Sequence, residues 1–228
     1  MDNSNPTTRL ALLNSEVFLS SLSGMYCHTS LSGYHAKRSQ GLYICNIPYF
    51  NHQAYVLLSS LDETLFSQNK SIGLNASHAN YAKKHQLISS ATLNPFPTVD
   101  YAIGSVKLRK EWLMCEGDGS LLIKYTLIEA PFKITLHLNP LLNYRKVDEL
   151  TFANSNFNAL FGEKQNGVSF KLYPNFPSTN IQCSKTITYQ HRPHWKLGQV
   201  YELDTKDYSE NIEDVYNPGQ IGINLLED

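Results

Sequence analysis

Residues 132–138 read FKITLHL, and this stretch predicts the fold class of the chain. Its apolar residues alternate with Lys133, Thr135 and His137, which is the pattern of a half-buried strand, because successive side chains leave opposite faces of the pleat. The same alternation returns in three further stretches, at 106–109 (VKLR), 168–172 (VSFKL) and 185–189 (KTITY). This dominant signal predicts antiparallel strands through much of the chain.

Further strands are expected between these stretches. Residues 121–128 (LLIKYTLI) are apolar at nearly every position, which is typical of a central strand covered on both faces. Weaker candidates, rich in Val, Ile, Leu and Tyr, lie at 16–22, 41–47 and 54–61. Only residues 76–85 have a helical pattern, and it is short and weak.

The connections between these stretches carry the residues of hairpin turns. The sequence EGDG at 116–119 separates two strong strands, and Asn166-Gly167 precedes another, since glycine tolerates the positive φ of a tight turn. Five prolines are expected in loops, where a missing backbone donor costs little: Pro95, Pro97, Pro174, Pro177 and Pro193. Many strands at short spacing predict an all-β fold, a large antiparallel β-sandwich with few short helices, as a single domain over residues 1–228.

The composition excludes several classes of protein. The 228 residues (25.8 kDa) are 42% hydrophobic and only 17% charged, which excludes a disordered chain. Nineteen Lys and Arg against 20 Asp and Glu give a net charge of −1 without a basic run, so no nucleic-acid partner is expected. No stretch approaches the roughly 20 apolar residues of a membrane span, and the polar start has no secretory pattern. Four separated cysteines without a CxxC pair then favour a reduced, cytoplasmic protein.

Carboxylates are the first candidates for chemistry, because acid/base or nucleophilic work on sugars needs two of them. Acidic residues crowd the stretch 202–214, where Glu213 and Asp214 could form an acid/base pair. Adjacent residues on a strand point to opposite faces, however, so a solvated acidic loop is the favoured interpretation. Asp62 and Glu63 follow an apolar run, and there we expect them to cap a turn.

The densest polar and aromatic cluster lies at residues 191–195 (HRPHW). His191 and His194 could ligate a metal, but Pro193 breaks the helix that would align them and no third ligand is apparent, so no metal is expected. Trp195 with nearby aromatic and histidine side chains could stack on a sugar ring. The favoured alternative is a packed Trp195 with both histidines on the surface. No phosphate-binding glycine motif occurs, and we expect no cofactor.

Several stretches, read in order, resemble the N-terminal domain of glycogen debranching enzymes of the bacterial and archaeal amylo-α-1,6-glucosidase type. The resemblance covers roughly residues 16–225 and rests on short motifs: 23–26 (SGMY), 29–33 (TSLSG), 37–42 (KRSQGL), 56–63 (VLLSSLDE), 94–98 (NPFPT), 108–114 (LRKEWLM), 117–125 (GDGSLLIKY), 138–145 (LNPLLNYR), 201–202 (YE) and 213–219 (EDVYNPG). Ser39-Gln40 stand where the family has Tyr-His, and Lys206-Asp207 stand where it has Arg-Gly. A role of those family residues at the active-site rim would be weakened here.

The resemblance implies a galactose-mutarotase-like supersandwich, which family members combine with a C-terminal α/α toroid that carries the catalytic carboxylates. No helical-hairpin region occurs in these residues, so the chain is expected to be the non-catalytic half, an excised domain without catalytic residues. It would support the toroid of the same polypeptide and contact an α-glucan, either glycogen or a maltooligosaccharide. The candidates for glycan or inter-domain contact are Lys37, Arg38, Trp112, Arg145, His191, His194, Trp195, Glu213 and Asp214.

Two other functions stay open from the sequence. A self-contained, mutarotase-like sugar epimerase would use His137 or His191 as the acid and Glu202 as the base on a concave sheet. A freestanding interaction module would instead keep an apolar patch for a partner and have no affinity for sugars. Polarimetry of glucose anomers distinguishes the epimerase from the debranching-enzyme domain, because only an epimerase accelerates their interconversion. Titration with a glucan distinguishes the interaction module from that domain, because the module would not bind the sugar.

Overall fold

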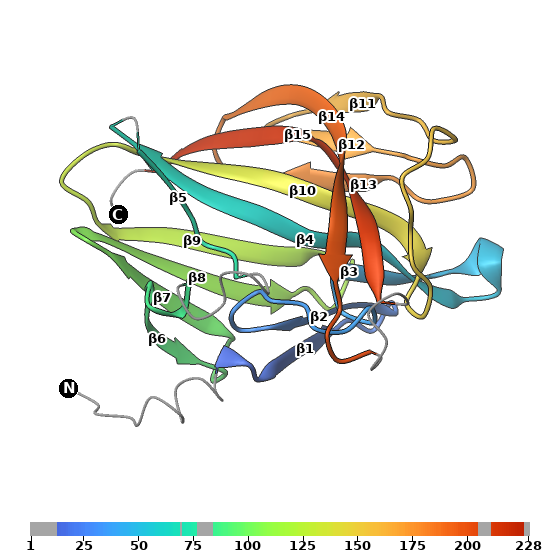
Figure 1. Cartoon of the computed structure of the whole chain (residues 1–228), viewed down its shortest axis with the longest axis horizontal. Helices are drawn as coiled ribbons and strands as arrows, with labels where there is room; N and C mark the ends of the chain where they lie inside the picture. The colour runs from blue at the N-terminus through green and yellow to red at the C-terminus, as the bar shows by residue number, and fades with distance from the viewer. Residues whose placement is uncertain (1–12, 69, 77–83, 205–210, 226–228) are drawn as a thin grey trace.

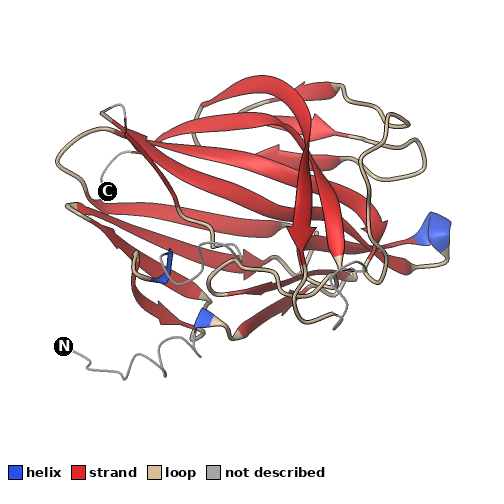
Figure 2. Ribbon diagram, viewed as in Figure 1, coloured by secondary structure: helices blue, strands red, loops and turns tan. Residues whose placement is uncertain are grey.

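Antiparallel strands form almost all of the regular structure (Figure 1, Figure 2). The computed structural model describes residues 13–68, 70–76, 84–204 and 211–225. Helical structure in these residues is limited to short turns such as η1 (Pro48–Phe50), and none of it is long and apolar enough to cross a membrane. The predicted all-β antiparallel sandwich is confirmed. The helical pattern at 76–85 falls largely on 77–83, outside the described residues.

The largest sheet has eight strands. In the order of their pairing they are β1 (Glu16–Ser20), β2 (Met25–Ser30), β3 (Gly41–Ile47), β4 (Gln53–Ser67), β10 (Ile134–Lys146), β15 (Ile212–Leu225) and β14 (Ile187–Val200), with β5 (Lys70–Gly73) paired to β4. The strand expected at 41–47 is confirmed as β3. The one expected at 54–61 is the middle of the longer strand β4.

Two smaller sheets complete the fold. One has four strands, β6 (Ile88–Thr92), β7 (Thr98–Ile103), β8 (Val106–Met114) and β9 (Leu121–Glu129), and the other has three, β11 (Phe161–Lys164), β12 (Gly167–Phe170) and β13 (Thr179–Gln182). The turn at 116–119 joins β8 to β9, and Asn166, with φ 51°, joins β11 to β12. Both predicted hairpins are therefore confirmed.

Both smaller sheets pack against the same face of the large sheet. Glu63 of β4 pairs with Leu138 of β10, and Leu138 pairs with Ile221 of β15, so their side chains share one face. Ile221 pairs in turn with Tyr189 of β14. At one end of this row Glu63 bonds to side chains of β8 and β9, and at the other end the Tyr189 ring packs against rings of β11 and β12. The hydrophobic core lies between these layers.

The opposite face of the large sheet carries a row of polar and small residues. Thr64 pairs with His137, and His137 pairs with Gly222, so these residues lie side by side across β4, β10 and β15. Asp62 and Asn139 form the adjacent pair. Among the described strands, none packs over these residues as a second layer. We call this surface of the large sheet the open face.

Two local predictions are wrong. β9 is an edge strand of its sheet rather than a central one, and its residues Leu122 and Ile128 are 51% and 49% exposed. Pro193 lies inside β14 rather than in a loop. It occupies an interruption of the register between His191 and His194, on an edge strand, where proline removes no ladder hydrogen bond.

Candidate functional site

Arg145 of β10 and Glu213 of β15 form an ion pair inside the domain. Their side chains are 3% and 0% exposed, and the guanidinium donates from Nε and Nη2 to the two carboxylate oxygens. Glu213 also accepts hydrogen bonds from the Tyr201 hydroxyl and, at 2.9 Å, from the backbone N–H of Thr151. Burial opposes the charge of Arg145, yet Glu213 and Tyr201 beside it raise its pKa. Both oxygens of Glu213 are thus committed to structural bonds.

The segment between β2 and β3 folds over this ion pair. Arg145 Nη2 donates to the backbone carbonyl of Arg38 at 2.8 Å, and Arg38 Nε donates to Asp204 at 3.0 Å. Gln40 is buried, and its side-chain oxygen accepts the backbone N–H groups of Ala36 and Lys37 at 2.8 and 3.0 Å. Gln40 belongs to the Ser39-Gln40 departure from the family pattern, and its two hydrogen bonds fix the conformation of this segment. The other departure, Lys206-Asp207, lies outside the described residues.

The interpretation of Glu213 and Asp214 as a solvated acidic loop is wrong. Both residues belong to β15, whose alternation buries Glu213 completely and turns Asp214 toward the other side. The Asp214 carboxylate accepts the backbone N–H groups of Ala153 and Gly198 at 3.0 and 3.1 Å. The expectation that these two neighbours do not share a site agrees with this geometry.

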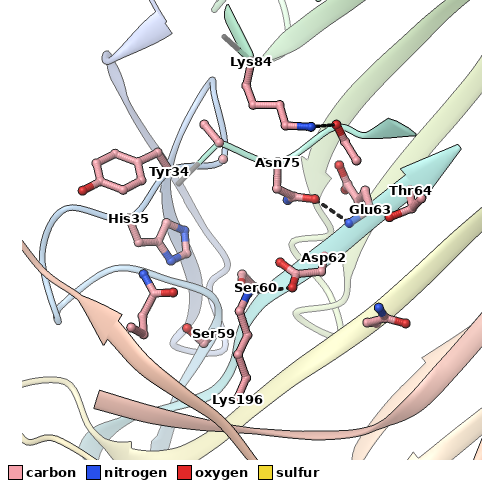
Figure 3. Close-up of a pocket in the computed structure, with 15 residues that line it drawn as sticks. Tyr34, His35, Ser59, Ser60, Asp62, Glu63, Thr64, Asn75, Lys84 and Lys196 are labelled. Atoms are coloured by element: carbon pink, nitrogen blue, oxygen red, sulfur yellow. Dashed lines mark hydrogen bonds and ion pairs between the residues drawn. The ribbon is translucent and has the colours of Figure 1, made fainter. Parts of the chain in front are cut away.

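A cavity of about 350 Å³ opens beside β4, β14, the connecting segment 33–35, and the end of β5 with the residues that follow it, 73–76 (Figure 3). We call it the sheet-face cavity. Its described lining is mainly polar: Gly33, Tyr34, His35, Ser59, Ser60, Asp62, Glu63, Thr64, Gly73, Asn75, Ala76, Lys84, Asn139, Lys196 and Gln199. Asp62 and Asn139 are paired on the open face, so the cavity continues onto that surface.

Hydrogen bonds fix the walls of the sheet-face cavity. Asn75 accepts the backbone N–H of Glu63 and donates to the Leu61 carbonyl at 2.7 Å. Lys196 of β14 reaches Asp62 of β4 with an Nζ–Oδ2 distance of 2.7 Å (Figure 3). These bonds tie the connection after β5 and the edge strand β14 to the same stretch of β4, which gives the cavity a defined shape.

The sheet-face cavity presents mostly uncharged hydrogen-bonding groups. The charges of Asp62 and Lys196 offset each other, the Lys84 ammonium donates to the backbone carbonyl of Gly73, and the Glu63 carboxylate points to the opposite face of β4. His35 is buried, and its Nε2 lies 2.8 Å from the Thr29 hydroxyl. Burial lowers the pKa of His35 to about 3, helped by nearby positive charges, so its imidazole is neutral at pH 7. Such a lining suits a neutral ligand with many hydroxyl groups.

Replacing His35 by glutamine is expected to weaken the fall of stability in acid. An unfolded histidine titrates near pH 6.5, whereas folded His35 titrates at about 3, so below pH 6.5 the unfolded chain binds a proton that the folded chain excludes. The stability contributed by neutral His35 is complete above pH 6.5 and is lost by about 1.4 kcal/mol per pH unit as the pH falls. Urea unfolding across this range measures the slope. His194→Gln, at an exposed site, is the control for the change of residue type, and an unchanged slope in His35→Gln would contradict the prediction.

A second cavity, of about 370 Å³, shares Tyr34 with the first. Its lining includes Lys37, Gln40 and Glu202, and Lys37 Nζ lies 2.8 Å from a carboxylate oxygen of Glu16. Glu202, the base of the epimerase alternative, therefore lies at this cavity, whereas His137 lies on the open face. Neither cavity has both residues in its lining.

His191, His194 and Trp195 lie along the edge strand β14. The His191 Nδ1 is 3.1 Å from the Tyr189 hydroxyl, and His194 Nδ1 is 2.9 Å from a backbone carbonyl. Trp195 is half-buried: its indole N–H donates to the Asn154 carbonyl at 3.1 Å, and its ring packs against two other aromatic rings. Within the described part of the chain, no three His, Cys, Asp or Glu side chains are grouped as a metal site would require.

Three of the predicted contact residues are interior residues. Trp112 is 1% exposed, with the Lys110 ammonium 4.5 Å from its ring centre, and Arg145 and Glu213 form the buried pair described above. These three side chains are thus packed inside the domain, and their contact with a glycan or another domain stays a prediction. The structure leaves the others at or near the surface, and their contact with a glycan or another domain stays a prediction: Lys37, Arg38, His191, His194, Trp195 and Asp214.

Sequence reasoning missed most residues of the sheet-face cavity. Asp62 does not cap a turn, because β4 continues to Ser67 and places Asp62 in mid-strand. A signal was present in the polar residues at every second position, 60, 62 and 64 in β4 and 135, 137 and 139 in β10. Two such stripes predict a shared polar face only if the two strands are known to pair.

Comparison with known proteins gave one result. Residues 16–228 match the family model described as "Glycogen debranching enzyme N terminal". The search of curated proteins and the search of solved structures returned no match.

Proposed function

The chain belongs to the glycogen debranching enzyme N-terminal family, and from this premise we propose that it is the non-catalytic sandwich of a debranching-enzyme-like glycosidase. The observation that supports this role is that the described lining of the sheet-face cavity presents a single carboxylate. Hydrolysis of a glycosidic bond needs two carboxylates flanking the linkage. Of the two that line the sheet-face cavity, Glu63 is bonded to Lys110 on the core side, which leaves only Asp62 facing the cavity.

In this proposal the sandwich supports a catalytic toroid that belongs to the same polypeptide. The buried pair Arg145–Glu213 fixes β10, β15 and the segment before β3, so the surface loops rest on a rigid base. Leu113 and Leu122 pair across β8 and β9 on the outer side of the four-stranded sheet and are 41% and 51% exposed. Exposed apolar pairs of this kind suit an interface with another domain.

The proposal includes contact with an α-glucan, glycogen or a maltooligosaccharide, in the cytoplasm. The sheet-face cavity offers hydroxyl and amide groups, which match the hydrogen-bonding groups of a neutral sugar. The four cysteines, Cys27, Cys45, Cys115 and Cys183, are all free thiols, as in a reducing compartment.

Two measurements on the 228-residue chain test the proposal. With a branched limit dextrin as substrate, the chain alone is expected to release no glucose, and in calorimetric titration it is expected to bind maltoheptaose at millimolar concentrations. Glucose release that disappears in Asp62→Asn would overturn the non-catalytic role, because Asp62 would then act as a catalytic acid or base. The absence of any heat of binding would overturn the glucan contact.

Polarimetry tests the epimerase alternative on the same sample. The chain is expected to leave the interconversion of glucose anomers at its spontaneous rate, since His137 is not in the lining of the cavity at which Glu202 lies. Acceleration that is lost in His137→Ala would favour the epimerase.

A further inference from the structure

An aromatic pair lies on the open face next to the sheet-face cavity. The rings of Phe66 (β4) and His137 (β10) have centroids 5.7 Å apart and planes that differ by only 11°. Phe66 is 38% exposed, so part of its ring surface faces solvent. The exposed part of the Phe66 ring can be covered by the C–H face of a ligand.

The space beside His137 is kept open by a glycine. His137 pairs with Gly222 of β15, and a Cβ atom at position 222 would lie 3.6 Å from the imidazole Cδ2 and 2.6 Å from the Thr188 hydroxyl. Any larger residue would therefore displace Thr188 and fill the room beside the ring. The absence of a side chain at position 222 therefore leaves room beside the imidazole of His137.

The aromatic pair and the cavity are neighbours along the same strands. His137 pairs with Thr64, which lines the sheet-face cavity, and Asn139, two residues further along β10, also lines it. Two residues span about 6.8 Å of an antiparallel strand. The aromatic pair and the polar cavity are therefore separated by a distance that one sugar ring and its linkage can cover.

We propose that the open face binds two adjacent glucose units of an α-glucan chain, one stacked on Phe66 and His137 and the next hydrogen-bonded in the sheet-face cavity through Asp62, Thr64 and Asn139. This inference rests on the proposed function and locates its glucan contact. The rings of Phe66 and His137 would contact the apolar C–H face of the first pyranose ring. The uncharged cavity groups, together with the offsetting charges of Asp62 and Lys196, account for the hydroxyl groups of the next one.

Titration calorimetry with glucose, maltose and maltoheptaose tests the proposal on the 228-residue chain. Maltose is expected to bind more tightly than glucose, because its second unit reaches the other half of the site. Phe66→Leu, which keeps an apolar side chain but removes the flat ring, should weaken maltoheptaose binding by about tenfold and abolish the gain from glucose to maltose. Phe66→Tyr keeps the ring and should keep the affinity.

Two further variants make the test specific. His137→Gln removes the second ring and should also weaken binding, whereas Phe152→Ala, at an exposed ring in the loop that follows β10, should leave it unchanged. Thermal unfolding of each variant verifies that it is folded. Wild-type affinity in Phe66→Leu and His137→Gln would place the glucan elsewhere and overturn this inference, while the glucan contact itself would stand. No binding of maltoheptaose by the unaltered chain would overturn both.

Discussion

Replacing Arg145 by methionine is expected to lower the free energy of unfolding by about 3–5 kcal/mol, the cost of leaving one partner of a buried ion pair without its counter-charge. Glu213 is fully buried, so in the variant its carboxylate would keep only the bonds from Tyr201 and Thr151. Urea unfolding followed by circular dichroism measures the loss. Arg109→Met is the matched control, because Arg109 pairs with Asp100 at 2.7 Å but is 43% exposed, and exposed pairs contribute only about 0–1 kcal/mol.

Removing the Glu213 charge as well should not restore stability at this site. Arg145 also donates to the backbone carbonyls of Arg38 and Lys146, at 2.8 and 2.9 Å, and these oxygens would lose their donor in any apolar replacement. The double variant Arg145→Met/Glu213→Leu is therefore expected to stay well below the wild type in stability. If either variant loses less than about 1 kcal/mol, the buried pair does not hold this part of the fold.

The local structure of this chain follows from its sequence because strands and turns are encoded by neighbouring residues. The enrichment in Ile, Leu and Tyr located β3 at its observed bounds, and the glycines at 117, 119 and 167 marked two hairpins. The same reasoning failed for β9, where an apolar run belongs to an edge strand with exposed leucine and isoleucine side chains. Apolar content does not distinguish a strand covered on both faces from one whose outer face is exposed.

The candidate site could not be assembled from the sequence, because its contacts join distant segments. Arg38 and Asp204 are 166 residues apart, and Arg145 and Glu213 are 68 residues apart. In β4, Asp62 and Glu63 are equivalent as a sequence pattern, yet Asp62 lines the cavity and Glu63 is buried against Lys110. The ordered family motifs did predict membership of the glycogen debranching enzyme N-terminal family, which the match over residues 16–228 confirms.

The buried pair Glu63–Lys110 joins the two largest sheets across the core. Both residues are nearly inaccessible, the Lys110 ammonium contacts one oxygen of Glu63, and the Tyr125 hydroxyl donates to the same oxygen. The ammonium also lies over the ring of Trp112, 4.5 Å from its centre. Arg145 donates to two backbone carbonyls, whereas the Lys110 side chain donates to none among the described hydrogen bonds. The described hydrogen bonds of these three polar side chains therefore all stay within the network.

This difference predicts opposite results for single and combined replacement. Lys110→Met alone should lower the free energy of unfolding by about 3–5 kcal/mol, because it leaves the Glu63 carboxylate buried without its counter-charge. The triple variant Glu63→Leu/Lys110→Met/Tyr125→Phe removes every member of the network with little change of volume, and the methionine retains a contact with the Trp112 ring. Its stability should return to within about 1 kcal/mol of the wild type or exceed it. Urea unfolding of both variants measures these differences in stability. A triple variant as unstable as Lys110→Met would contradict the prediction, because the ion pair itself would then stabilise the packing of the two sheets.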